Sequence, residues 1–242
     1  MKYSIIIPTL NEERLLPNLL NQLNNKHFRS KFDLEIIISD GGSIDKTIEI
    51  AQKNCDIVKI HSNKHRQNIA EGRNEGAKLA SGDVLVFINA DIIFPDIDIF
   101  FSFLNDKFIN SSYLAMTCNV KVFPEEEILA DKLFHVGYNK YFKLLNSLGI
   151  GMGRGECQVI WKNVFNGVNG YNKEITAGED FDLFRRIRKK GRILFASNIC
   201  VYESPRRYRK LGYSGVTWSW IKNGFSVFLK SKSISKEWEQ VR

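Results

Sequence analysis

Polar residues recur directly after short apolar runs in this chain of 242 residues, and several of them carry chemically useful groups. A carboxylate can accept hydrogen bonds or take up a proton, and an amide can both donate and accept hydrogen bonds. The polar residues that follow the first, second and fourth runs are Asn11, Glu12, Asp40, Asn89 and Asp91, together with the hydroxyl-bearing Thr9. Two more carboxylates, Glu179 and Asp180, stand just before a helical pattern. These residues are therefore the candidates for ligand binding and catalysis.

Short apolar runs alternate with amphipathic stretches over the first hundred residues, which is typical of an α/β protein with a largely parallel sheet. The runs predict strands near 3–8, 33–39, 57–61 and 84–89. Helices are predicted from Pro17 onward, from Ser43 or Asp45 to Lys53, and over 69–79. Each strand then ends in a polar loop on one side of the sheet, where ligands bind in open α/β sheets.

The second half of the chain predicts a less regular order of elements. We expect strands at 113–123, 157–161 and 193–196, helices at 125–148 and 181–190, and a turn at 166–172. Proline and glycine are nowhere concentrated enough to mark a linker, so both halves are expected to share one core.

The glycine-rich loop after the second run matches neither of two common phosphate-binding motifs. The segment Gly41-Gly42-Ser43-Ile44-Asp45-Lys46-Thr47 lacks the glycine that precedes the lysine of a P-loop. A GxGxxG motif is absent after the first run, where Pro8-Thr9-Leu10-Asn11 stands instead. The sequence therefore supports neither an ATPase nor a dinucleotide-dependent dehydrogenase.

Positive charge gathers at the C-terminal end. Lysine and arginine number 35 against 27 acidic residues, a net charge of +8, and residues 204–242 contain nine basic and two acidic residues. Such a segment favours phosphate-bearing partners, whether a nucleotide, a nucleic acid or an anionic lipid headgroup.

Neither a membrane span nor a secretion signal is predicted. The longest run without a charged residue, Phe108–Val120, has 13 residues, fewer than the roughly 18 to 20 that a spanning helix needs. The N-terminal residues lack a signal-peptide pattern, so we expect a cytoplasmic protein. Because Cys55, Cys118, Cys157 and Cys200 form no CxxC pair, we expect reduced and mostly buried thiols.

Five short motifs in order carry a resemblance to a known family. They are Pro-Thr-Leu-Asn-Glu from Pro8, Ser-Asp-Gly-Gly-Ser from Ser39, Arg-Asn-Glu-Gly from Arg73, Asn-Ala-Asp from Asn89 and Gly-Glu-Asp from Gly178. Over about residues 2–196 the chain closely resembles family 2 of the inverting nucleotide-sugar glycosyltransferases. The resemblance implies a GT-A fold, a Rossmann-like and mostly parallel central sheet flanked by helices.

The resemblance also implies a division of the chain. We expect one GT-A domain over 1–203, with a nucleotide-sugar-binding half at 1–95 and an acceptor half at 96–203. Residues 204–242 would form a basic, aromatic, helical extension.

The resemblance places a nucleoside-diphosphate sugar against the strand ends. Asp40 would accept hydrogen bonds from the base or ribose, and a basic element after the last helix would close over the diphosphate. The residues expected on the donor are Pro8, Thr9, Asn11, Glu12, Asp40, Arg66, Arg73, Asn89, Ala90, Asp91, Arg206 and Arg207. Turn formation by Asp40, helix capping by Asn11 and Glu12, and a solvated charge at Arg73 are the structural alternatives.

Asn89-Ala90-Asp91 stands in the place of the family's Asp-x-Asp metal motif, so the resemblance implies that Asp91 binds Mg²⁺ or Mn²⁺. Asn89 departs from the motif because an amide brings no charge. Metal affinity is then weaker than usual for the family, or the metal is dispensable. A simple strand-ending turn is the other interpretation.

The resemblance makes Asp180 the general base that deprotonates the acceptor hydroxyl, with Glu179 supporting it or touching the acceptor. Attack from the face opposite the leaving group then inverts the anomeric carbon. Both carboxylates would otherwise cap the following helix.

Acceptor and location stay open at this level. The acceptor is a sugar, a polysaccharide or a lipid-linked molecule. Aromatic residues such as Trp218 and Trp220 alternate with Lys222 and other bases in the C-terminal segment. This pattern suits a peripheral contact with the inner face of a membrane, and equally a helix docked on the core.

Two other functions are alternatives to the transferase. Nucleic-acid binding is not expected, because the positive charge does not continue over the first 203 residues. A catalytically silent nucleotide-sugar-binding homologue is the alternative that Asn89 makes conceivable.

Overall fold

A computed structural model describes residues 1–63, 65–230 and 233 of the chain, and the rest of the predicted tail, residues 231–232 and 234–242, lies outside this description. The strands are β1 (Tyr3–Thr9), β2 (Leu34–Asp40), β3 (Ile57–Ile60), β4 (Val84–Ile88), β5 (Ile92–Ile93), β6 (Tyr113–Val122), β7 (Cys157–Trp161) and β8 (Arg192–Glu203). The helices are α1 (Leu16–Leu23), α2 (Lys26–Lys31), α3 (Thr47–Asn54), α4 (Ile69–Leu79), α5 (Ile97–Phe103) with a π-helical continuation (Leu104–Ile109), α6 (Leu129–Ser147), α7 (Lys162–Gly167), α8 (Glu179–Arg188) and α9 (Arg206–Lys230).

The described strands form one sheet in the order β3-β2-β1-β4-β7-β6-β8-β5. β1 pairs in parallel with β2 and β4, and β2 pairs in parallel with β3. β7 inserts antiparallel between β4 and β6, and β8 lies parallel to β6. The predicted α/β fold with a mostly parallel, Rossmann-like sheet is confirmed, and each antiparallel pair includes a strand from the second half, β7 or β8.

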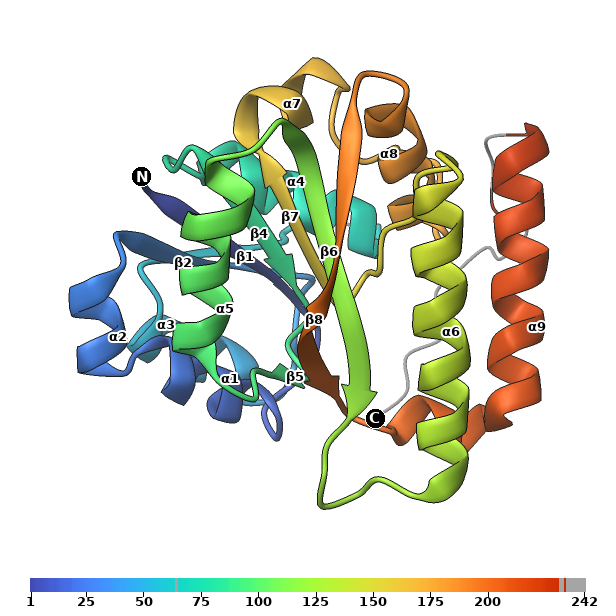
Figure 1. The fold of residues 1–242 in the computed structure, drawn as a ribbon. Coiled ribbons are helices and arrows are strands. Elements are labelled where there is room, and N and C mark those ends of the chain that lie inside the picture. The colour runs from blue at the N-terminus through green and yellow to red at the C-terminus, as the bar shows by residue number, and fades with distance from the viewer. Residues whose placement is uncertain (64, 231–232, 234–242) are drawn as a thin grey trace.

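Helices cover both faces of the sheet because the central strands are apolar on both sides (Figure 1). Ile5 and Ile7 of β1 face a cluster that α1, α2, α3 and α5 complete. Ile6 faces the opposite cluster, which includes buried residues of α4, α7 and α8. The side chains of β1 therefore alternate between two cores, and the polar strand ends are left at one edge.

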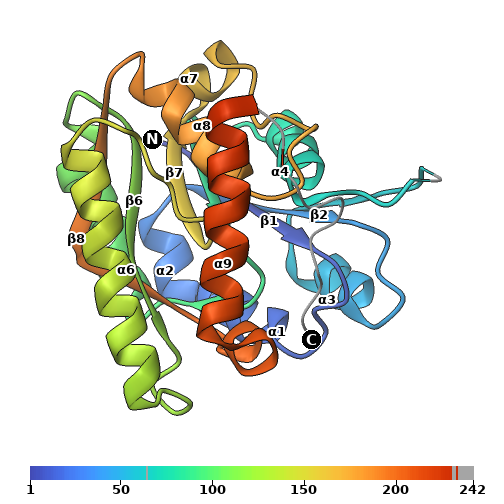
Figure 2. The same cartoon turned by 90° about the vertical axis from the view of Figure 1, so that its right-hand side faces the viewer.

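The long helices α6 and α9 stand side by side, and α6 is the one that lies along β6 and β8 (Figures 1 and 2). Tyr208 and Val216 of α9 are buried with Val122 of β6, and Phe134 of α6 packs against them. The start of the C-terminal segment is thus docked on the core. Within α9 the direction changes at Gly212, which has a left-handed φ of 68°.

Three predicted boundaries differ from the structure, and an irregular strand pairing explains the largest difference. β8 continues to Glu203, beyond the predicted end at 196, because the pairing with β6 shifts between Cys118–Ala196 and Asn119–Cys200. The irregularity breaks the alternation that identifies a strand. The predicted turn at 166–172 begins inside α7, and the predicted helix at 125–148 begins at Leu129.

The cysteines are free thiols, as predicted, with Cys118 and Cys157 buried and Cys55 and Cys200 half-buried. Among the described helices, none combines enough length and apolarity to cross a membrane.

The packing of α4 on β1 yields a stability prediction. A methyl group at Gly76 would lie 2.5 Å from Cγ2 of Ile6, so Gly76→Ala is expected to destabilise the protein by about 1–3 kcal/mol through overpacking. Gly137 in α6 is the control, since no described atom lies within 4 Å of its added Cβ apart from its chain neighbours and the backbone of its own helix. Gly137→Ala should be neutral or stabilising by up to about 1 kcal/mol. Urea unfolding of both variants measures the difference, and equal midpoints would contradict this account of the packing.

Candidate active site

Two cavities meet at the carboxyl ends of the parallel strands. The larger has a volume of about 1250 Å³ and the smaller about 490 Å³. The residues that line both are Ile69, Asn89, Asp91, Arg206 and Arg207. The loop after β4 and the first turn of α9 therefore form the boundary between the cavities.

Asp40 holds together the loops beneath the smaller cavity. Its side chain is fully buried, and Oδ2 accepts hydrogen bonds from the hydroxyls of Thr9 (2.8 Å) and Ser43 (2.6 Å). Its Oδ1 accepts from the backbone N–H groups of Gly42 (2.9 Å) and Ser43 (2.7 Å). The turn that was the alternative for Asp40 is thus present, and its carboxylate is directed into the loop.

Asn11 joins the same two loops. Its backbone is left-handed at φ 52°, a conformation that asparagine tolerates better than most residues. Its Oδ1 accepts from the N–H of Ile44 at 2.7 Å, and its own N–H donates to the Ser43 hydroxyl at 2.7 Å. Asn11 and Asp40 shape the floor, and neither is among the described residues that line the cavities.

Most of the other residues predicted on the donor do line the smaller cavity. They are Pro8, Thr9, Glu12, Arg66, Asn89, Ala90, Asp91, Arg206 and Arg207. Residues far apart in the sequence are therefore brought to one surface by the ends of β1, β4 and β8.

Arg206 bridges the ends of these strands. Its Nη2 lies 2.6 Å from Glu12 Oε1 and 3.0 Å from Asp91 Oδ2. Burial opposes the charge of this guanidinium, but the two carboxylates outweigh burial and raise the pKa of Arg206. A permanent cation therefore stands between the two cavities.

Arg73 is fully buried, which excludes the structural alternative of a solvent-exposed charge on the helix. Its Nη1 donates to Glu179 Oε1 at 2.8 Å, and its Nη2 donates to Asn89 Oδ1 at 3.1 Å and to the carbonyl of Gly155 at 2.7 Å. The guanidinium also lies over the ring of Tyr171, 5.3 Å from its centre. Arg73 lines the larger cavity and connects α4, α8 and the residues after β4.

Asp180 and Glu179 begin α8 at the wall of the larger cavity. Burial and the adjacent Glu179 charge raise the pKa of Asp180 to about 7, against an opposing effect of Arg73. Burial also raises the pKa of Glu179, and Arg73 partly offsets this effect. Asp180 can therefore exchange a proton near neutral pH, as a general base must.

Three charged residues that line the larger cavity, Arg154, Glu156 and Glu203, were not predicted from the sequence. Arg154 donates through Nε to Glu156 Oε2 at 3.2 Å, and Glu203 Oε1 accepts from the hydroxyl of Tyr208 at 2.7 Å. Glu203 ends β8, so the rule that placed Asp40 and Asp91 would have identified it had the strand been predicted to its full length. Arg154 and Glu156 precede β7, where that rule gives no signal.

The carboxylate oxygens of Asp91 suit a divalent cation, but the described side chains alone do not form a complete metal site. Within the described ranges, no three His, Cys, Asp or Glu side chains are grouped to hold a metal. Asp91 faces both cavities, whereas Asn89 Oδ1 accepts from Arg73. Mg²⁺ and Mn²⁺ commonly bind one or two carboxylates together with phosphate oxygens. Asp91 can supply such a carboxylate if Arg206 moves away from Asp91 Oδ2.

Comparison with solved structures identifies the same fold in transferases. The mannosyltransferase PcManGT from Pyrobaculum calidifontis, in complex with GDP-Man and Mn²⁺, superposes with a TM-score of 0.65 at 18% identity. The match covers 90% of this chain and 59% of that one. TarS 1–349 from S. aureus, in complex with UDP-GlcNAc, superposes with a TM-score of 0.61 at 17% identity, covering 84% of this chain and 58% of that one. At these identities the likeness concerns the fold.

Sequence comparison provides the family. A dolichyl N-acetyl-α-D-glucosaminyl phosphate 3-β-D-2,3-diacetamido-2,3-dideoxy-β-D-glucuronosyltransferase of Methanococcus voltae is 37% identical over 92 residues. The match spans 36% of this chain and 28% of that relative's own length. The profile described as Glycosyl transferase family 2 matches residues 4–124, half of the chain and the part that contains the ends of β1, β2 and β4. The chain therefore belongs to glycosyl transferase family 2.

Proposed function

We propose that the protein transfers a sugar from a nucleoside-diphosphate sugar to a hydroxyl of a sugar, polysaccharide or lipid-linked acceptor, with inversion. The observation that carries the proposal is the meeting of Asp91 and Asp180 in one cavity. Asp91 also faces the smaller cavity, so a group bound in the smaller cavity lies next to the larger cavity, which Asp180 lines.

The donor occupies the smaller cavity in this proposal. Thr9, Glu12 and Arg66 surround the nucleoside portion, and Arg206 and Arg207 face the diphosphate. Asp40 and Asn11 act one step removed, because their hydrogen bonds fix the loops that form the floor. The GDP-Man and UDP-GlcNAc bound to proteins of the same fold support a nucleotide sugar and leave the base open.

A divalent cation at Asp91 would neutralise charge on the departing diphosphate. Asn89 remains engaged with Arg73, so the protein's contribution of charge is the Asp91 carboxylate. Arg206 already stabilises negative charge at this position, which supports a weak metal requirement. The Mn²⁺ in the mannosyltransferase complex supports metal use by a protein of this fold.

Asp180 is the catalytic base of the proposed reaction. Its carboxylate takes the proton of the acceptor hydroxyl as that oxygen forms a bond to the anomeric carbon, and the bond to the diphosphate oxygen breaks. The electron pair leaves with the diphosphate, and attack from the opposite face inverts the centre. Glu179, held by Arg73, keeps a charge beside Asp180 and so favours proton uptake.

Nucleotide binding is the first test of this assignment. A thermal-shift screen with UDP, GDP, CDP and dTDP, each with and without Mn²⁺, should give a raised Tm with one base. At a ligand concentration of 100 times Kd, binding stabilises the fold by about 2.7 kcal/mol. A flat response to every nucleotide in both conditions would contradict the assignment of the smaller cavity.

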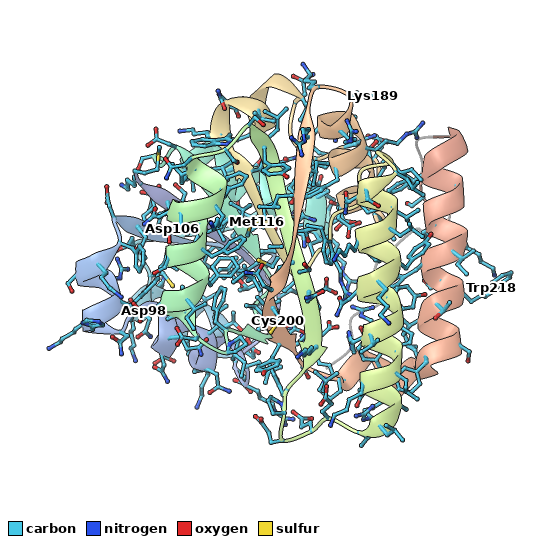
Figure 3. The ribbon with its side chains drawn as sticks, in the orientation of Figure 1. Asp98, Asp106, Met116, Lys189, Cys200 and Trp218 are labelled. Atoms are coloured by element: carbon cyan, nitrogen blue, oxygen red, sulfur yellow. The ribbon has the colours of Figure 1, made fainter. Side chains whose placement is uncertain are left out.

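Removal of the base separates catalysis from donor binding. Asp180→Asn should lower kcat by about 10²–10⁴-fold, the usual contribution of a general base, and leave donor affinity nearly unchanged. Asp98→Asn is the control because Asp98 lies on α5, away from α6 and α9 (Figure 3). Steady-state kinetics and donor titration of both variants provide the measurement. Full turnover by Asp180→Asn would remove this residue from the mechanism.

The raised pKa of Asp180 predicts a pH dependence. The base works when deprotonated, so kcat/KM should rise with pH through about 7 and level off above it. Because the Glu179 charge contributes to the raised pKa, Glu179→Gln should move this limb to lower pH. Rate profiles from pH 5 to 9 measure both, and a limb that stays in place in Glu179→Gln would refute the coupling.

A further inference from the structure

A stripe of apolar side chains on α6 is exposed. Its members follow one another at spacings of three, four or eight residues, so they share one side of the helix. Each is more than half exposed, and they are Leu129, Leu133, Val136 and Leu144, with Leu148 directly after the helix. At about 100° per residue, Leu133 points away from His135, which is buried and approaches Glu203 of β8. The stripe therefore faces away from the sheet.

α9 adds exposed apolar side chains beside this stripe. Trp218 is 59% exposed and Ile221 is 54% exposed, and Trp218 projects away from the sheet (Figure 3). Both residues line the larger cavity, as do the exposed Leu133 and Tyr141 of α6, so the exposed parts of the two helices meet. Together with the stripe, Tyr141, Trp218 and Ile221 form one surface, the α6–α9 face. A contiguous exposed apolar surface marks a binding site for a protein or a membrane.

The exposed charges of α6 and α9 are positive. Asp131 is the one acidic residue of α6, and it is buried and bound by Arg209 at 2.5 Å. The sequence of α9 contains no aspartate or glutamate. Lys132 pairs with Glu127, which precedes α6, at 3.6 Å. Among the described side chains of the two helices, the exposed lysines are Lys132, Lys140, Lys143, Lys210 and Lys222. The α6–α9 face is thus apolar and cationic at once.

We propose that the α6–α9 face docks on the surface of an anionic bilayer. Its apolar side chains enter the boundary between headgroups and acyl chains, and the lysines beside them contact the headgroup phosphates. A lysine stem can lie along apolar surface while its ammonium group stays in the polar layer. Lys222 has this arrangement, because its Nζ lies 4.8 Å from the centre of the Trp218 ring. Apolar burial and charge attraction then act together on one face.

Docking on the core and docking on a bilayer use different sides of α9. Val216 is buried with Tyr208 and with Val122 of β6, whereas Trp218 is exposed. At about 100° per residue, Val216 and Trp218 point in nearly opposite directions. The two interpretations that the sequence left open for this segment are therefore compatible.

A second copy of the chain is a less suitable occupant of the α6–α9 face. A two-fold symmetric contact uses the same patch on both partners. Lys140 and Lys143 of one copy would then meet the lysines of the other, while the single acidic residue of α6 is buried, and like charges repel. Anionic headgroups supply the opposite charge, so charge complementarity favours the bilayer.

Vesicle flotation of the full chain tests the docking. The protein should bind vesicles that contain about one third phosphatidylglycerol at least about tenfold more tightly than vesicles of phosphatidylcholine alone. Binding should weaken when salt rises from about 0.1 M to about 0.5 M, because salt screens the lysines. Neither donor nor acceptor is present, so the result is independent of the proposed function.

A carboxylate on the face tests the apolar contact. Leu144→Glu and Ile221→Glu should each weaken binding to phosphatidylglycerol vesicles by at least about tenfold, because a charge must then enter the apolar boundary. Ile99→Glu is the matched control, since Ile99 is 59% exposed on α5, away from α6 and α9 (Figure 1). Its binding should stay within about twofold. The Tm of each variant checks the fold.

Removal of lysines tests the electrostatic contact. Lys140→Gln combined with Lys143→Gln should weaken binding to phosphatidylglycerol vesicles by at least about tenfold. Lys26→Gln combined with Lys107→Gln removes the same charge from α2 and the π-helical segment, away from α6 and α9 (Figure 1). Binding of this control should stay within about twofold. An equal loss in both double variants would reduce the effect to net charge and overturn the inference.

Tryptophan fluorescence locates the contact without a change of charge. Brominated phosphatidylcholine in the phosphatidylglycerol vesicles should quench the bound protein. Trp218→Phe should lose part of this quenching, whereas Trp161→Phe, which removes a ring stacked on Phe108, should not. Quenching that is unchanged in Trp218→Phe would place the contact elsewhere and overturn the inference.

Three further outcomes would overturn the inference. They are equal binding to the two kinds of vesicle, no binding to either, and equal losses in Leu144→Glu and Ile99→Glu. A dimer in light scattering that Leu144→Glu dissociates, without vesicle binding, would assign the α6–α9 face to a second copy.

Discussion

The site depends on the buried ion pair between Arg73 and Glu179. Through its two Nη groups, Arg73 ties α8 to Asn89 and Gly155, and so fixes the wall that carries Asp180 relative to the end of β4. Loss of one partner would leave an uncompensated charge in the interior, which is far more costly than the pair itself is stabilising. The same contact keeps Glu179 beside Asp180, where its charge helps to raise the pKa of Asp180 into the range of a useful base. Architecture and acid–base chemistry thus rely on one guanidinium.

The sequence predicted the first half of the fold well because the information there is local. β1, β2 and β4 are short apolar runs, each followed at once by polar residues, and parallel pairing brings their ends together. What the pattern does not contain is the direction of a side chain within a loop. Asp40 and Asn11 were expected on the nucleotide, yet their hydrogen bonds are made within the loops. The local sequence also does not show whether the side chain of Arg73 is exposed on its helix or buried beneath it.

The second half of the chain was harder to predict because its contacts are long-range. Glu203 was missed since an irregular pairing in β8 interrupts the strand pattern before the residue that matters. Arg154 contacts Glu156 and Asn139 and lies in the wall of a cavity. Sequence spacing predicts neither these contacts nor this position. The amphipathic pattern of α6 and α9 fits a groove, a membrane contact or simple core packing. Pairing of Phe134 with Tyr208 and Tyr213 shows that part of this surface is core.

The two cavities draw on different stretches of the polypeptide. Apart from Thr176 and the arginine pair at the start of α9, the smaller cavity is built from residues 8–91, inside the part that the family profile recognises. The apolar walls of the larger cavity come from residues 133–224. Selection for a new acceptor could therefore change residues 133–224 while residues 8–91 keep their chemistry. Arg206 and Arg207 line both cavities, so such a change would have to preserve them.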